Sequence, residues 1–91
     1  MSRIRWTTPA ADQLADIVKH IQQDNPDVAR RVAQSIFSSI EKLDAFPSLG
    51  RPGEKEGTRE MVSAPYVIVY RLKADHVVEI LYIWHGAQDW R

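Results

Sequence analysis

The end of the chain carries the residue types best suited to chemistry. His85 follows a run of β-branched and aromatic residues, and Asp89, Trp90 and Arg91 come a few positions later. An imidazole titrates near neutral pH, so it can carry a proton in catalysis. A ring, a carboxylate, an indole and a guanidinium after a buried strand predict a functional surface. Asp89 and Trp90 also predict a tail that folds back onto the sheet.

Four cations precede this segment and could hold an anionic group such as a phosphate. They are Arg51, Lys55, Arg59 and Arg71. Acidic residues are interleaved with the first three, at Glu54, Glu56 and Glu60. A carboxylate beside each cation weakens a phosphate site, so surface ion pairs are the favoured interpretation of this stretch.

Arg71 and His85 each have a structural interpretation beside the catalytic one. Arg71 can pair with Glu79 across a hairpin, if three residues connect the two strands. A two-residue connection would place the two side chains on opposite faces. His85 can bind nearby backbone at the end of its strand. In both cases the structural role is the favoured one.

No pattern in the sequence predicts a metal or another cofactor. His20 and His76 are isolated, and no His, Asp and Glu set has the spacing of metal ligands. Gly50, Gly53 and Gly57 lack the strand–turn–helix context of a phosphate-binding loop. The chain has no cysteine, which excludes disulfides and thiol catalysis.

Length and charge limit the function further. We expect one domain over residues 1–91, because so short a chain builds a single core. The net charge is zero, which argues against direct binding of free DNA, since that affinity scales with the phosphates neutralised. We find no signal-like apolar segment or membrane span and expect a cytoplasmic protein.

The first half of the chain predicts a short strand and two helices. Arg3–Trp6 alternates like a strand. Thr7-Thr8-Pro9, a hydroxyl N-cap followed by proline at the first helical position, gives the start signal of a helix that ends near Asp24. Asn25-Pro26 repeats this signal for a second helix. The short link between the helices predicts an antiparallel hairpin.

The second half predicts a loop and three strands. The loop, from Phe46 to Gly53, is rich in proline and glycine. Strands are expected at 58–64, 66–72 and 77–84, with a turn at 73–76. The order β-α-α-β-β-β predicts an α+β fold: an N-terminal helical hairpin packed on one face of a mainly antiparallel four-stranded sheet.

Several phrases, in this order, resemble the RelE/ParE superfamily, the toxins of bacterial type II toxin–antitoxin modules. They are Ile4-Arg-Trp, Asp24-Asn-Pro-Asp-Val-Ala-Arg30, Phe46-Pro-Ser-Leu-Gly-Arg-Pro-Gly53, Gly57-Thr-Arg-Glu60, Tyr66-Val-Ile-Val-Tyr-Arg71, and Val78-Glu-Ile-Leu with His85-Gly-Ala-Gln-Asp-Trp90. The resemblance covers nearly the whole chain and implies a growth-inhibiting toxin that a cognate antitoxin neutralises.

The resemblance leaves three mechanisms open. ParE-like members poison DNA gyrase, RelE-like members cut mRNA on the ribosome, and a homologue that is no longer toxic would only bind the antitoxin. In the nuclease branch, the resemblance assigns the role of catalytic proton carrier to His85 and phosphate contacts to Arg59 and Arg71. A contact with the antitoxin is a second interpretation of Arg71. The zero net charge and the compensating glutamates favour the ParE-like mechanism.

Overall fold

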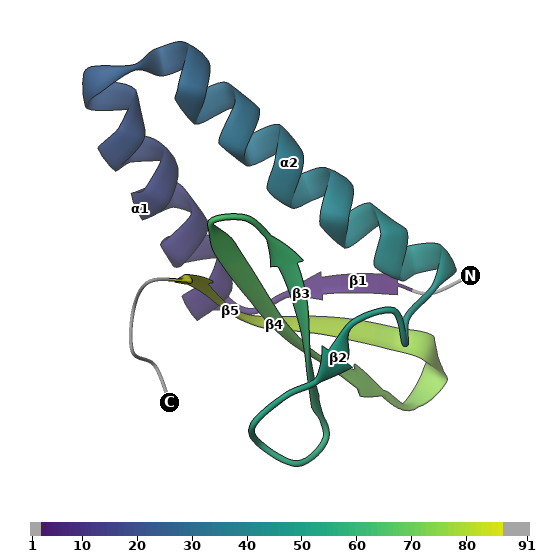
Figure 1. Ribbon diagram of the computed structural model, residues 1–91. Helices are drawn as coiled ribbons and strands as arrows, with labels where there is room; N and C mark the ends of the chain where they lie inside the picture. Colours follow the sequence, from purple (N-terminus) through teal and green to yellow (C-terminus); the bar gives the residue numbers. More distant parts are fainter. Residues whose placement is uncertain (1–2, 87–91) are drawn as a thin grey trace.

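A helical hairpin covers one face of a five-stranded sheet (Figure 1). The computed structural model describes residues 3–86. The helices are α1 (Thr8–Asp24) and α2 (Pro26–Ala45). The strands are β1 (Arg3–Trp6), β2 (Arg51–Pro52), β3 (Thr58–Ser63), β4 (Tyr66–Lys73) and β5 (Val77–His85), and a single 3₁₀ turn, Ala74–His76, joins β4 to β5.

The strands lie in the order β1-β5-β4-β3-β2. β1 runs parallel to β5, and the other neighbours are antiparallel. The helical hairpin on one face of a mainly antiparallel sheet is therefore confirmed, but the expected four strands were one too few. The missing strand, β2, has two residues and one of them is proline, so it carries no alternation that a sequence could reveal.

Asn25 ends one helix and begins the next. Its backbone N–H donates to the carbonyl of Ile21, 2.8 Å away, and its extended backbone stops α1 there. Its side-chain Oδ1 then accepts the N–H of Val28 at 3.2 Å, which caps α2. Since one residue serves both helices, the link is short and the hairpin is antiparallel, as predicted.

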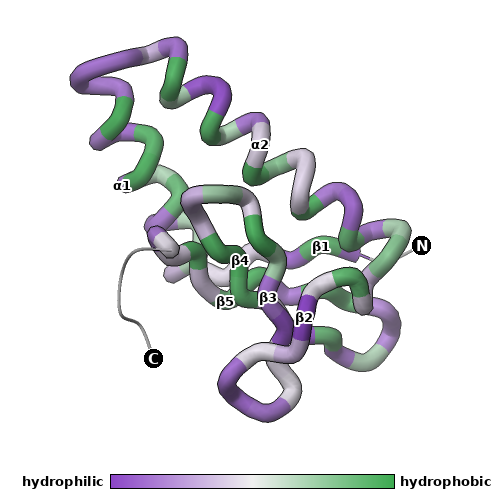
Figure 2. Tube along the Cα trace, viewed as in Figure 1, coloured by the Kyte–Doolittle hydropathy of each residue, from purple (hydrophilic) through white to green (hydrophobic). Residues whose placement is uncertain are grey.

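The core lies between the helices and the sheet. Tyr66, Ile68 and Tyr70 of β4 point toward the helices and meet buried residues of α2 and β5. Val67 and Val69 point to the opposite face and are also buried. Figure 2 shows this concentration of apolar residues along β4 and β5, and polar residues at the turn between the helices and in the β2–β3 loop. We call the sheet face away from the helices the open face.

A β-bulge changes the alternation of β5. Val69 pairs with Tyr82 and Tyr70 with Ile80, so Leu81 is the extra residue. Beyond the bulge, Ile83 faces the core while Tyr82 and Trp84 face the open side. This switch places an aromatic pair on the open face at the end of the strand.

The start of α1 binds the bulged part of β5, where β1 no longer covers it. The hydroxyl of Thr7 donates to the carbonyl of Ile80 at 2.7 Å and lies 3.2 Å from that of Leu81. The backbone N–H of Ile83 donates to Oε1 of Gln13 at 2.7 Å. These contacts satisfy backbone groups on an exposed sheet edge and fix α1 to the sheet.

Among the described residues, no helix combines the length and the apolar character that crossing a membrane requires.

Candidate functional site

The open face carries a cluster of cations around one buried carboxylate. Glu79 accepts a hydrogen bond from Nε of Arg71 at 2.7 Å. Its other oxygen lies 3.8 Å from Nη1 of Arg5 and 3.9 Å from Nζ of Lys73. The predicted pairing of Arg71 with Glu79 is confirmed, and the three-residue connection between β4 and β5 brings them opposite each other.

The hydrogen bond from Arg71 is the main cause that lowers the pKa of Glu79 below its usual value. Burial acts in the opposite direction, and the charges of Arg71, Lys73 and Arg5 add smaller effects that lower the pKa further. Glu79 is therefore ionised at neutral pH and stays so in mildly acidic solution.

A second buried carboxylate lies across the sheet. Glu60 of β3 is 4% exposed, and its Oε1 accepts from Nε of Arg51 at 2.9 Å. This pair joins β3 to the short strand β2, where Arg51 and Glu60 are register partners. Arg51 thus forms an ion pair, which is the interpretation that the interleaved acidic residues favoured.

Arg59 holds the loop between α2 and β2. Its Nη1 donates to the carbonyls of Ser48, at 3.2 Å, and Gly50, at 2.8 Å. Arg59 pairs in register with Tyr70, whose side chain faces the helices, whereas Arg71 faces the open side. The two arginines that the resemblance assigned to one phosphate therefore lie on opposite faces of the sheet.

Tyr70 holds the same loop from within the core. Its hydroxyl accepts the N–H of Gly50 at 2.9 Å and donates to the carbonyl of Pro47 at 2.8 Å. Burial raises its pKa, which the bond from Gly50 and the charge of Arg59 partly offset. A Cβ at Gly50 would lie 2.6 Å from the Tyr70 hydroxyl oxygen, so only glycine fits there.

His85 lies at the far end of the β4–β5 pair. It is the register partner of Tyr66, and the two rings meet edge to face with centroids 5.3 Å apart. Along β4, Tyr66 is five residues from Arg71, or about 17 Å at the usual strand rise. The structure therefore does not bring His85, Arg59 and Arg71 together. Their catalytic role stays a prediction.

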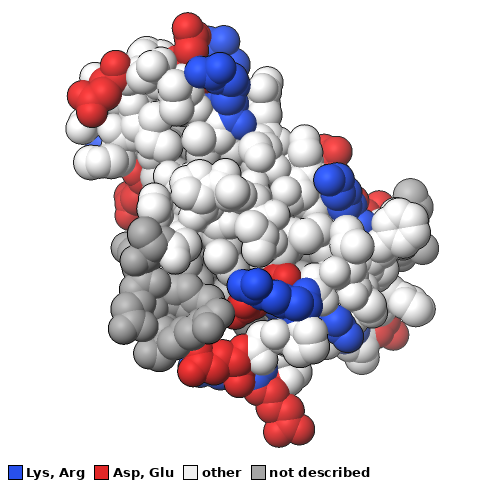
Figure 3. Space-filling view, in the orientation of Figure 1, with Lys and Arg blue, Asp and Glu red and all other residues white. Residues whose placement is uncertain are grey.

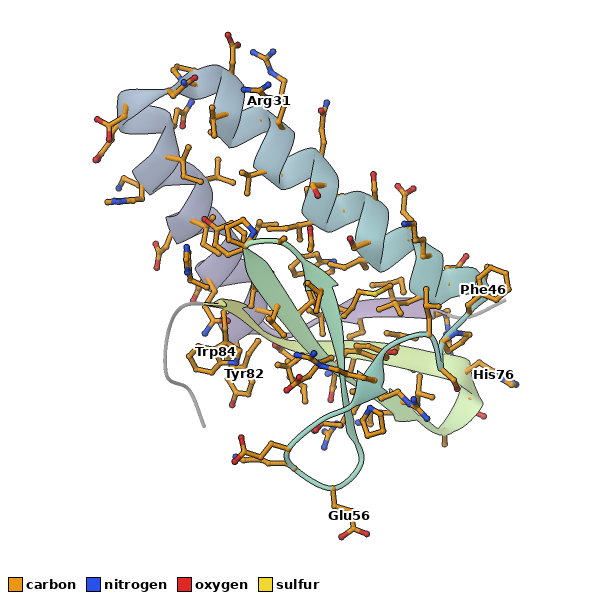
Figure 4. The ribbon with its side chains drawn as sticks, in the orientation of Figure 1. Arg31, Phe46, Glu56, His76, Tyr82 and Trp84 are labelled. Carbon is orange, nitrogen blue, oxygen red and sulfur yellow. The ribbon has the colours of Figure 1, made fainter. Side chains whose placement is uncertain are left out.

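A groove on the open face was not anticipated from the sequence. It has a volume of about 460 Å³ and is lined by Glu54, Lys55, Thr58, Glu60, Val69, Leu81, Tyr82 and Trp84. The rings of Tyr82 and Trp84 stack with centroids 5.6 Å apart and lie side by side near the end of β5 (Figure 4). Recognising this groove requires the bulge, which no residue pattern in β5 reveals.

Positive and negative side chains are interspersed on the face seen in Figure 3. Blue and red atoms lie next to each other where β2 and β3 run, and Glu56 projects from the tip of the β2–β3 loop (Figure 4). Within residues 3–86, no three His, Asp or Glu side chains cluster as metal ligands. The predicted fold-back of Asp89 and Trp90 lies outside the described residues.

Comparison with known families identifies the chain. Residues 4–90 match the family described as "ParE toxin of type II toxin-antitoxin system, parDE". The chain belongs to the ParE toxin family. This ParE-family protein is therefore a toxin of a type II toxin–antitoxin system, and the RelE/ParE resemblance of its sequence is confirmed.

Two named relatives of this ParE-family toxin are also named as toxins. It is 44% identical over 90 residues to "Putative toxin Y4kP" of Sinorhizobium fredii, covering 97% of this chain and 92% of the relative. It is 33% identical over 88 residues to "Toxin RelE2" of Caulobacter vibrioides, covering 97% and 99%. Sequence similarity alone thus gives the family but not the target.

Solved structures of toxin–antitoxin systems share the fold. A chain of the chromosomal ParDE system of P. aeruginosa superposes with a TM-score of 0.79 at 29% identity, covering 93% of this toxin and 96% of that chain. A chain of the RelBE2 toxin–antitoxin complex of Mycobacterium tuberculosis gives a TM-score of 0.65 at 26% identity, covering 92% and 96%.

Proposed function

We propose that this toxin inhibits growth in the cytoplasm by binding DNA gyrase. The observation that carries the proposal is the separation of the residues that RNA cleavage would need. Arg59 and Arg71 lie on opposite faces of the sheet, and His85 is paired with the other end of β4 from Arg71. Poisoning a protein target by binding needs no such convergence.

The charge environment supports the same mechanism. Cleavage of RNA next to a 2′-hydroxyl concentrates negative charge on the phosphate, so it needs cations free to stabilise that charge. Here Arg71 is bonded to Glu79, Arg51 to Glu60, and Arg59 to two loop carbonyls. Breaking the contact of Arg71 or Arg51 would take from a buried carboxylate the arginine that is hydrogen-bonded to it, which is costly.

The alternative function is that of a ribosome-dependent mRNA endonuclease. The observation in its favour is His85, a titratable ring on the last strand, together with similarity to the protein named "Toxin RelE2". A toxin fold that only binds antitoxin is the third possibility. All three include a cognate antitoxin, which the likeness to chains of the ParDE and RelBE2 systems supports.

One induction experiment separates the three mechanisms. The toxin is expressed from a tight promoter, and chromosomal DNA breaks, mRNA integrity and growth are followed in the same culture. A gyrase poison should give filamentous cells with broken DNA and intact mRNA. Early codon-phased mRNA cuts would overturn the proposal in favour of the nuclease, and unimpaired growth would favour the binding-only homologue.

The variant His85→Ala sharpens this test. If the toxin acts on gyrase without chemistry, the imidazole has no part in proton transfer. Growth inhibition by His85→Ala should then be reduced less than about tenfold. His20→Ala, on the exposed side of α1, is the matched control. Purified toxin should also inhibit supercoiling by gyrase in vitro. Abolished mRNA cutting in His85→Ala, with cutting retained in His20→Ala, would establish the nuclease instead.

A further inference from the structure

The open face has a cationic patch at the end where β4 passes into β5. The register places Arg3, Val77 and Lys73 in one row across β1, β5 and β4, and Arg5, Glu79 and Arg71 in the next row. Paired residues of neighbouring strands point to the same face. Four cations, Arg3, Arg5, Arg71 and Lys73, therefore surround one carboxylate among the described positions of these two rows.

One carboxylate cannot neutralise the cationic patch. Glu79 is buried and uses one oxygen for Arg71, while Arg5 and Lys73 share the other at 3.8 and 3.9 Å. The side chains of Arg5, Arg71 and Lys73 are 67%, 48% and 42% exposed, so all three remain accessible from the solvent. The buried carboxylate of Glu79 attracts these cations but does not balance their charge, so the patch keeps an excess of positive charge at the surface.

We infer that the cationic patch binds an acidic, extended segment of a partner protein. Cations two residues apart on one strand are about 7 Å apart, the same spacing as alternate side chains in an extended peptide. A segment lying along β1 can therefore place carboxylates opposite Arg3 and Arg5, and one lying along β4 can place them opposite Lys73 and Arg71. Guanidinium groups bind carboxylates with paired hydrogen bonds, which suits this arrangement.

The charges around the patch favour a peptide over a nucleic acid. A nucleic acid carries a phosphate at every nucleotide. Along the open face it would meet Glu79 and then the adjoining groove, where two carboxylates, Glu54 and Glu60, lie with one cation, Lys55. A peptide can carry its acidic side chains only where the cations lie. The aromatic rings that could stack on bases, Tyr82 and Trp84, are at the other end of β5.

An NMR titration of the ¹⁵N-labelled toxin tests this inference. The inference does not depend on gyrase being the target. The probe is a twelve-residue peptide in which Glu and Thr alternate. Amide shifts should change in β1, at the end of β4 and at the start of β5, and should be lost when Gln replaces Glu in the peptide. Shifts confined to the helices, or equal shifts with the Gln peptide, would overturn the inference.

Two triple variants give the matched comparison. Arg3→Gln, Arg5→Gln and Lys73→Gln together remove the excess charge but keep Arg71 for Glu79. Lys19→Gln, Arg30→Gln and Lys42→Gln remove the same charge from exposed helix positions. The first variant should bind the Glu peptide at least tenfold more weakly, and the second within about twofold of the parent. Equal weakening in both would show a non-specific charge effect and overturn the assignment.

Further controls exclude the other outcomes. A twelve-nucleotide single-stranded DNA serves as the competing probe. If the toxin binds this DNA more tightly than the Glu peptide, and the triple variant of the patch loses that binding, the inferred peptide ligand is overturned in favour of a nucleic acid. Circular dichroism melting shows whether the triple variant folds. If it does not, the single change Arg3→Glu at the edge strand takes its place and should weaken peptide binding at least threefold. Unchanged binding in Arg3→Glu would then overturn the inference.

Discussion

At the scale of single residues, the two buried carboxylates organise the open face. Glu79 and Glu60 are each held by an arginine from a neighbouring strand. Removing one partner of such a pair leaves a buried charge without compensation, which destabilises more than the pair itself stabilises. The two arginines therefore stabilise the sheet and also form part of its surface.

Glu79 should make stability fall in acid. Its folded-state pKa lies below 4.5, so below about pH 4.5 the unfolded chain takes up the proton more readily than the folded chain. The stabilisation is complete above that pH and is lost as the pH falls through the folded pKa. Glu79→Gln should lower the urea midpoint at pH 7 and flatten its decrease between pH 5 and pH 3. Glu41→Gln, on the exposed side of α2, should change neither, and an unaltered acid profile in Glu79→Gln would contradict this account.

The hydroxyl of Tyr70 should contribute far more to the free energy of unfolding than the hydroxyl of an exposed tyrosine. Tyr70→Phe leaves the N–H of Gly50 without its acceptor in a buried place, at a cost of about 1–3 kcal/mol. For a domain of this size, each kcal/mol lowers the melting temperature by about 4–8 °C. Tyr82→Phe is the control, since Tyr82 is 39% exposed. Equal melting temperatures for the two variants would show that the loop is held by other contacts.

Sequence reasoning reached some of these contacts and missed others for a physical reason. Arg71 and Glu79 could be matched because their charges are complementary, but only the structure shows the three-residue connection that fixes their register. The partners of Arg59 are backbone carbonyls, and a carbonyl leaves no trace in the residue type. The support that Arg59 gives to the loop could therefore not be predicted from the sequence.

At the scale of elements, the helix starts were predictable and the sheet edges were not. Asn25, directly before a proline, caps α2 as expected, and Thr7 caps α1 one residue earlier than the hydroxyl next to Pro9. The bulge at Leu81 and the two-residue strand β2 depend on contacts with distant segments. The groove beside Tyr82 was missed for the same reason, because the face of a side chain after a bulge cannot be counted from the sequence alone.

The two helix caps should differ in their contribution to stability. Thr7→Val removes the cap of α1 and also the hydroxyl that binds the carbonyls of Ile80 and Leu81. We expect a loss of about 2 kcal/mol, against about 1 kcal/mol for Asn25→Ala, which removes a cap on an exposed turn. Urea denaturation of both variants measures this difference. A larger loss in Asn25→Ala would show that α1 is not fixed to β5 through Thr7.

At the scale of the whole molecule, the net charge is zero but the charged side chains are unevenly distributed over the surface. Its positive and negative charges balance overall, yet the cationic patch lies at one end of the open face and carboxylates line the groove beyond it. Large apolar side chains, among them Phe37, Phe46 and Leu49, are about half exposed or more. A surface of this kind suits a protein that works in complexes.

The toxin should therefore be stabilised strongly by its antitoxin. A ligand that binds only the folded state adds about 2.7 kcal/mol at one hundred times its Kd. Co-expression with the adjacent small open reading frame should raise the soluble yield and lift the melting temperature of the purified toxin by ten degrees or more. A frameshifted copy of that reading frame is the control. An isolated toxin that is already highly stable and gains nothing would contradict the expectation.

The bulge at Leu81 also determines how β5 tolerates changes in length. Deleting Leu81 would turn β5 into a regular strand while Tyr82, Ile83, Trp84 and His85 kept their present faces. Inserting a residue directly after Val77, with the turn before it unchanged, would exchange the faces of Val78 and Glu79 and bring a carboxylate into the core. Homologues that differ in length by one residue here can therefore share the same core, provided that the difference falls at the bulge.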